Sequence, residues 1–99
     1  MSAQQKNQEQ RSNKRTENLR FLASLVKEGG LKGQEIWAGK LRQMYFQARN
    51  NNNPLHHEWN YINRECSHVL KKLAEEGVVK FKEYKVDKYS ISKTNYIIQ

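Results

Sequence analysis

Several kinds of residue and segment are scarce in this chain of 99 residues, and each scarcity excludes a class of protein. Cys66 is the single cysteine, so no disulfide can form within the chain. No apolar run approaches the roughly 20 residues that a membrane-spanning helix needs. The opening residues, MSAQQKNQEQ, contain no apolar segment of the kind that a signal peptide requires. We therefore expect an intracellular protein that is not inserted in a membrane.

The sequence also lacks the motifs of a catalytic, cofactor or metal site. It contains no phosphate-binding loop, no nucleophile elbow and no paired-carboxylate arrangement. His56, His57, Glu58, Cys66 and His68 could suggest a metal, but their spacing matches none of the usual zinc patterns. Cys–His catalysis is also disfavoured, because Cys66 lies on an apolar helical stripe and His68 does not. We predict that the protein is not an enzyme and has no cofactor or metal.

Positive charge is what the sequence has in excess. Lysine and arginine number 18 against 10 aspartates and glutamates, which gives a formal net charge of +8 and a pI near 9.8. A surplus of this size on a chain the length of one domain favours a polyanionic partner such as a nucleic acid. The alternative interpretation is that the charge serves only solubility.

The first 15 residues, MSAQQKNQEQRSNKR, contain almost nothing to bury. We expect them to form a disordered basic arm, and the folded domain to cover residues 16–99. Arg11, Lys14 and Arg15 in this arm could lie on phosphates or in a minor groove. The arm could equally be an unstructured terminus with no partner.

Two amphipathic helices are predicted in the first half of the domain. The first is capped by Thr16 and runs to about Glu28, where two glycines end it. A very short strand is expected near Leu31. The second helix is expected over residues 34–49, with Trp37 on its apolar stripe. Three basic residues lie off that stripe and could contact a phosphate backbone or solvent: Lys40, Arg42 and Arg49.

Residues 54–76 carry the clearest helical pattern in the chain. Asn53 and Pro54 suit the N-cap and the first helical position, and Gly77 suits the residue just after the helix. Six residues fall on one face at helical spacing and are expected to reach the core: Trp59, Ile62, Cys66, Val69, Leu70 and Leu73. Cys66 should therefore be a buried, unreactive thiol.

The part of the chain after this helix has the composition of β-strands, but its register is open. In one pairing, residues 78–83 meet residues 88–92. In the other, residues 84–91 meet residues 96–98, and a three-stranded sheet would reconcile the two. The terminal NYIIQ is apolar enough for an edge strand, through which a homodimer could form.

The segment VLKKLAEEGVVKF, followed by KYSI, resembles the end of a winged helix-turn-helix domain. Members of that superfamily end with a helix carrying an L-x-x-L pattern, a glycine, an apolar strand, a charged wing and a second strand. The resemblance extends mainly over residues 54–92. It implies an α+β fold of three helices followed by a small antiparallel β-hairpin or sheet. It also implies binding to DNA, RNA or protein, since winged helices bind each of these.

The polar face of the third helix is the predicted contact surface for a nucleic acid. Asparagine can pair with adenine edges and arginine with guanine edges, while lysine more often meets phosphate. The predicted contacts on this helix are Asn60, Arg64, Ser67, His68 and Lys71. On the wing, Lys82 and Lys85 would hold phosphates. The alternative is that the helix face is simply solvated, because the outer face of an amphipathic helix is always polar.

The sequence thus predicts a nucleic-acid-binding winged-helix protein, a small DNA-binding or transcription-regulating protein, with DNA favoured over RNA. Two alternatives stay open. One is an RNA- or ribosome-binding winged helix, because aromatic residues exposed on a sheet suit unpaired bases. The residues that support it are Tyr84, Tyr89 and Tyr96. The other alternative is a protein–protein interaction module within a larger complex, with an apolar surface patch around Tyr45, Phe46 or Tyr96.

Overall fold

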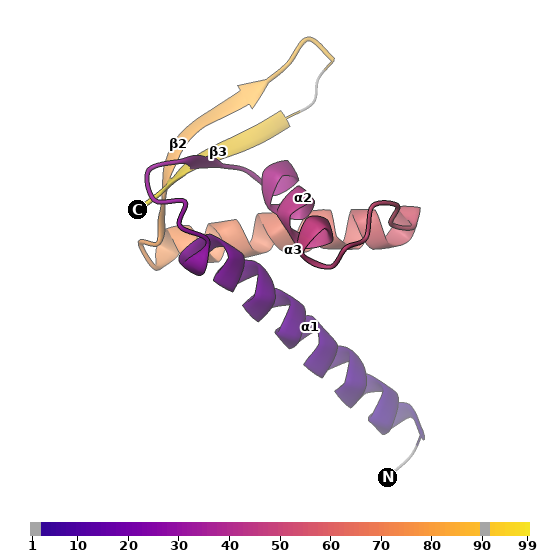
Figure 1. Ribbon diagram of the computed structural model, residues 1–99. Coiled ribbons are helices and arrows are strands. Elements are labelled where there is room, and N and C mark those ends of the chain that lie inside the picture. The colour runs from indigo at the N-terminus through magenta and orange to yellow at the C-terminus, as the bar shows by residue number, and fades with distance from the viewer. Residues whose placement is uncertain (1–2, 90–91) are drawn as a thin grey trace.

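The computed structural model describes residues 3–89 and 92–99, and side chains from residue 14 onward within these ranges. The predicted α+β class is confirmed: three helices accompany a small antiparallel sheet of three strands (Figure 1). This order of elements is compatible with a winged-helix topology. The elements are α1 (Ala3–Glu28), β1 (Glu35–Ile36), α2 (Ala38–Ala48), α3 (His56–Glu75), β2 (Val79–Val86) and β3 (Ser92–Ile98).

α1 begins much earlier than the sequence predicted. It starts at Ala3 rather than Thr16, so the backbone of residues 3–15, expected to be disordered, is helical. This segment contains no glycine or proline and is rich in glutamine, lysine, arginine and glutamate, all good helix formers. The prediction relied on the lack of residues to bury, which does not oppose helix formation by itself. Figure 1 shows the N-terminal half of α1 extending away from the other elements.

The hydrophobic core lies where the three helices meet one face of the sheet. α1 contributes Leu22 and Val26, and α2 contributes Leu41, all essentially inaccessible to solvent. Five of the six residues predicted for the stripe of α3 are buried: Ile62, Cys66, Val69, Leu70 and Leu73. Trp59 is the exception, because 37% of it is exposed. It lies at the edge of the stripe and lines a groove between α2, α3 and β3.

α2 is shorter than predicted because residues that were expected to form its first turn form a strand instead. Glu35 and Ile36 form β1, pairing with Ile97 and Tyr96 of β3, so α2 begins only at Ala38. The predicted strand at Leu31 and the predicted helix start at Gln34 are therefore both wrong. By helical spacing Ile36 would lie beside the stripe of the helix predicted over residues 34–49, but pairing with a distant strand decides its conformation.

The two ends of α3 are fixed by different residues and hydrogen bonds. Leu55, rather than Asn53, is the N-cap, and the Asn53 N–H instead donates to Asn51 Oδ1 at 3.2 Å. The predicted stop at Gly77 is confirmed: its φ is 80°, in the left-handed region that favours glycine. Val78 N–H donates to Leu73 O at 2.9 Å, which closes a Schellman-type C-terminus and leads directly into β2.

The sheet has the strand order β1-β3-β2, with both neighbours antiparallel to β3. β2 pairs with β3 from Val79–Ile98 to Val86–Ser92, so neither predicted register is right. The hairpin turns between Val86 and Ser92, which is after the turn of the first predicted register and before that of the second. β3 is also the central strand, which corrects the predicted edge strand at the C-terminus and removes the basis for a homodimer through it.

No helix within residues 3–89 and 92–99 combines the length and the apolar character needed to span a membrane.

Replacing Leu70 with alanine tests the core assigned to α3. Leu70 is 1% exposed, so Leu70→Ala should lower the free energy of unfolding by about 2–5 kcal/mol. Urea denaturation followed by circular dichroism measures this loss. Leu55→Ala serves as the control, because Leu55 is 63% exposed. Equal losses in the two variants would contradict the assigned core.

The thiol of Cys66 should be inert in the folded protein. Cys66 is fully buried, and burial raises its pKa to about 12, so almost no thiolate forms at mildly alkaline pH. Iodoacetamide should therefore leave the native protein unmodified and alkylate the same residue in denaturant. Mass spectrometry measures both reactions. Alkylation at similar rates in the two conditions would show that the α3 face is open.

Candidate nucleic-acid interface

An open groove of about 570 Å³ lies between the start of α2, one side of α3 and β3. We call it the tryptophan groove, because both tryptophans of the chain line it. It takes side chains from three elements that are distant in sequence. Its lining includes Trp37 and Arg42 from around α2, Trp59, Asn63, Ser67 and Lys71 from α3, and Lys93 from β3.

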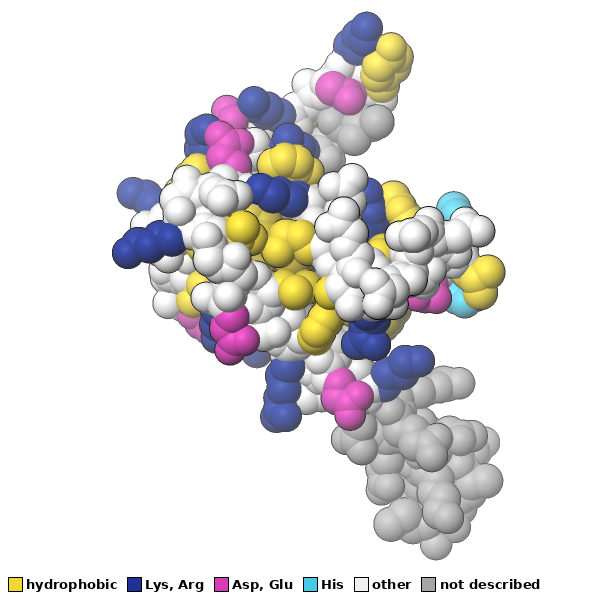
Figure 2. Space-filling view, in the orientation of Figure 1, with side chains coloured by type: hydrophobic (Ala, Val, Ile, Leu, Met, Phe, Trp, Pro, Cys, Tyr) yellow, Lys and Arg dark blue, Asp and Glu magenta, His cyan; other side chains and the backbone are white. Residues whose placement is uncertain are grey.

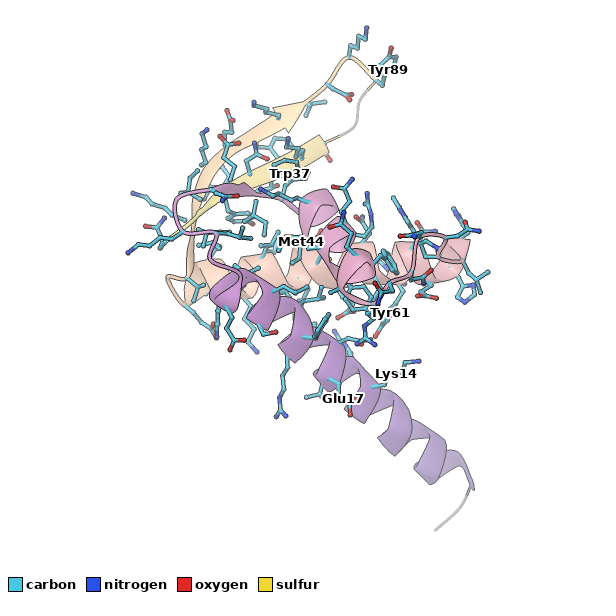
Figure 3. The ribbon with its side chains drawn as sticks, in the orientation of Figure 1. Lys14, Glu17, Trp37, Met44, Tyr61 and Tyr89 are labelled. Atoms are coloured by element: carbon cyan, nitrogen blue, oxygen red, sulfur yellow. The ribbon has the colours of Figure 1, made fainter. Side chains whose placement is uncertain are left out.

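Trp37 reaches the groove because it joins β1 to α2. Its backbone is extended, with φ −145° and ψ 170°, and it is the N-cap of α2. The indole lies between β3 and the start of α2 (Figure 3). A Cβ built on Gly39 would lie 3.3 Å from the Trp37 ring, so a glycine gives the indole room to pack there. Gly39 therefore accommodates a side chain of the groove.

Two cations of the groove lie over the faces of its tryptophans. Arg42 Cζ lies 3.9 Å from the ring centroid of Trp59, and Lys93 Nζ lies 3.8 Å from that of Trp37. Arg42 also donates from its guanidinium to Asn63 Oδ1 at 2.7 Å. Cation–π attraction and this hydrogen bond hold the two positive groups in place without neutralising their charge.

The charge of the groove has one sign. Arg42, Lys71 and Lys93 line it, and no aspartate or glutamate is among its lining residues. A concave surface with cations of one sign concentrates the positive potential and attracts polyanions. Hydroxyl and amide groups from Asn63 and Ser67 add polar groups for hydrogen bonds to a ligand.

The residues predicted on the third helix divide between two sides of α3. Ser67 and Lys71 line the tryptophan groove. Asn60 and Arg64 are exposed on α3 but lie outside the groove lining, and Asn60 Nδ2 is 3.1 Å from His56 Nε2. His68 is exposed on the side of α3 that meets α1, beside Lys72. The structure thus brings Ser67 and Lys71 together with the groove and separates His68 from it.

The predicted wing lysines are engaged by carboxylates. Lys82 forms an ion pair with Glu35 of β1, and Lys85 Nζ lies 3.1 Å from Glu83 Oε1. The hydrogen bond from Lys82 is the largest cause that lowers the pKa of Glu35 from its ordinary value of 4.5, and the same bond raises the pKa of Lys82. Neither lysine lines the groove. In the β2–β3 hairpin it is Lys93, in the segment predicted as a turn, that does.

The basic residues of the N-terminal segment lie on α1, away from the tryptophan groove. Lys14 and Arg15 are exposed and line a separate cavity between α1, the end of α2 and the start of α3 (Figure 3). Arg15 Nε lies 3.5 Å from Glu65 Oε2. The side chain of Arg11 lies outside the described residues.

Sequence reasoning missed the groove as a site, although it considered several of its parts. Trp37 and Trp59 follow helical spacing and were assigned to buried stripes. Arg42 was recognised as a basic residue off the stripe of α2. The signal that could have distinguished the tryptophans is that each lies at an end of its helical pattern, where a large ring can leave the core.

No protein-family model, curated protein or solved structure matches this chain. Among the described side chains, no three histidines, cysteines, aspartates or glutamates come together as a group that could hold a metal ion.

The ion pair between β1 and the hairpin predicts a pH-dependent stability. Because the pKa of Glu35 is lowered in the fold, its contribution is fully present above 4.5 and is lost as the pH falls through the lowered pKa. Glu35→Gln should therefore melt below the wild type at neutral pH, and the difference should shrink in acid. Thermal melts across pH measure this. Glu28→Gln, at the exposed end of α1, is the control. A gap that stays constant down to low pH would contradict the role of the charge.

Proposed function

We propose that this protein is a winged-helix protein that binds nucleic acid, with duplex DNA as its target and transcription regulation as its role. The observation that carries the proposal is the tryptophan groove, in which Arg42, Lys71 and Lys93 come together with no carboxylate. Three cations from three elements suit a row of phosphates better than a single small anion.

The exposed side of α3 supports the same proposal. Ser67 and Lys71 connect the groove to the outer face of the helix, where Asn60 and Arg64 are free of contacts with acidic side chains in the described structure. In the proposed complex, groove cations hold the backbone and fix the register. Asn60 and Arg64 then reach base edges, for which their amide and guanidinium groups are suited.

The protein-interaction alternative has less support. The apolar patch that it requires around Tyr45, Phe46 or Tyr96 is not on the surface, because these side chains are 5%, 7% and 7% exposed. Basic side chains are nevertheless spread over several parts of the face in Figure 2, so total charge is a weak guide to the site. The convergence that favours nucleic acid is local to the groove.

Neighbouring lysines on α3 provide a matched test of this proposal. Lys71 lines the groove, whereas Lys72 faces α1, so Lys71→Ala should weaken binding to random duplex DNA and Lys72→Ala should not. Loss of one phosphate contact should flatten the slope of log affinity against log salt by about 1. Arg64→Ala should also weaken binding, and the double variant Arg64→Ala, Lys71→Ala should weaken it further.

Fluorescence anisotropy at two or more salt concentrations measures these affinities, with circular dichroism confirming that each variant is folded. Wild-type affinity in Lys71→Ala, Arg64→Ala and the double variant would contradict the assignment of α3. Equal losses for Lys71→Ala and Lys72→Ala would show that total charge, and not the groove, determines binding.

A further inference from the structure

One face of strand β2 exposes an unusual row of large apolar side chains. Phe81, Tyr84 and Val86 are 56%, 60% and 57% exposed. We call these three residues the aromatic row. Isolated exposed apolar side chains are common, but three on one strand face of a small domain form a continuous surface that calls for a partner.

A β-bulge places these side chains on the same face. Phe81 is opposite Tyr96, Tyr84 is opposite Thr94, and the register shifts between Phe81 and Glu83. In a regular strand Lys82 would be paired, and alternation would put Glu83 on the face of Phe81 and turn Tyr84 away. The bulge therefore exchanges a charged side chain for an aromatic one on this face.

The aromatic row is continuous with the tryptophan groove. Its cross-strand partners on β3 are Tyr96, Thr94 and Ser92, and all three line the groove. Directly opposed side chains of an antiparallel pair have Cβ atoms only about 5 Å apart. The rings of Phe81 and Tyr96 also meet edge to face, with centroids 6.3 Å apart. The row thus extends the wall that β3 gives to the groove.

Charge around the row indicates a polyanion. Lys82 and Lys85 are paired with Glu35 and Glu83, so the charge beside the row comes mainly from Lys88 near the hairpin tip and Lys93 in the adjoining groove. Figure 3 shows Tyr89 at the tip of the same hairpin, where Lys88 Nζ lies 5.1 Å from its ring. An apolar face bordered by lysines suits a ligand that combines phosphates with flat aromatic rings.

The flat aromatic rings of such a ligand must be unpaired bases. A duplex presents its base edges in the grooves but keeps the base faces stacked inside, so exposed aromatic side chains cannot reach them. Phe81 and Tyr84 are paired with β3 residues two positions apart, so their separation along the strand is roughly 7 Å. That is about twice the ~3.4 Å rise of a stacked strand. The rings of Phe81 and Tyr84 can therefore each stack on a base only where the bases of the bound nucleic acid strand are not stacked on one another.

We propose that the aromatic row stacks the unpaired bases of a nucleic acid strand whose phosphates lie along the tryptophan groove. The preferred ligand is then a duplex that continues into a single-stranded segment. This inference rests on the proposed function and adds the class of target to it.

The test compares three probes of matched length: a random duplex, the same duplex with a single-stranded extension, and the extension alone as oligodeoxythymidine or oligouridine. The wild type should bind the extended duplex more tightly than the blunt one. Phe81→Ser and Tyr84→Ser should each lose about tenfold in affinity for the extended and single-stranded probes, on the scale of base–aromatic stacking. Binding to the blunt duplex should not change.

Conservative variants separate stacking from general surface effects. Phe81→Tyr and Tyr84→Phe keep a ring and should retain wild-type preference. A 2-aminopurine base in the extension should be quenched by the wild type and by these variants, and much less by Phe81→Ser or Tyr84→Ser. Comparison of the thymidine and uridine probes identifies whether the strand is DNA or RNA.

The outcomes distinguish this inference from the proposed function. If Lys71→Ala weakens binding to every probe while the serine variants bind all probes like the wild type, the aromatic row has another partner and the inference is wrong. Equal losses of the serine variants on blunt and extended duplexes would also overturn it. If Lys71→Ala, Arg64→Ala and the double variant all leave the affinities unchanged, the proposed function fails instead.

Discussion

The pairing of two residues in β1 with β3 is the constraint on which the arrangement of the molecule depends. Glu35 and Ile36 lie opposite Ile97 and Tyr96, which connects the middle of the chain to its end. Flanking backbone bonds, Gly33 N–H to Ile98 O at 2.7 Å and Ile98 N–H to Gln34 O at 3.0 Å, extend this connection. It holds β1 through Ile36, so that Trp37 becomes the N-cap of α2, and it makes β3 the central strand. It brings Trp37 and the start of α2 next to the hairpin wall, and this side of the groove faces Trp59 and Lys71 of α3.

Local patterns predicted the parts of the fold that local physics determines. The apolar stripe of α3 from Ile62 to Leu73 and the stop at Gly77 follow from helical periodicity and from the left-handed backbone that glycine accepts. The α+β class follows from the change to strand-forming residues after Gly77. These features require no knowledge of distant parts of the chain.

Features that depend on distant partners could not be predicted in this way. Ile36 fits a helical stripe, and only the presence of Tyr96 beside it selects a strand. The bulge at Lys82 changes which residues share a face of β2, and no periodicity reveals it. The site was predicted in part, because Ser67 and Lys71 line the groove. Lys82 and Lys85 instead contact the carboxylates of Glu35 and Glu83, and only the fold reveals these contacts. A net charge indicates a class of partner, but tertiary contacts determine which cations remain available.

Both tryptophans of the chain line the same groove, each with a cation over its ring. Indole emission depends strongly on the charges and solvent around the ring, so all of the tryptophan fluorescence of this protein originates at its candidate site. A molecule that enters the groove must move Arg42 or Lys93, or cover the rings they contact. The protein therefore contains its own optical reporter, which would signal occupancy of the groove without any attached dye.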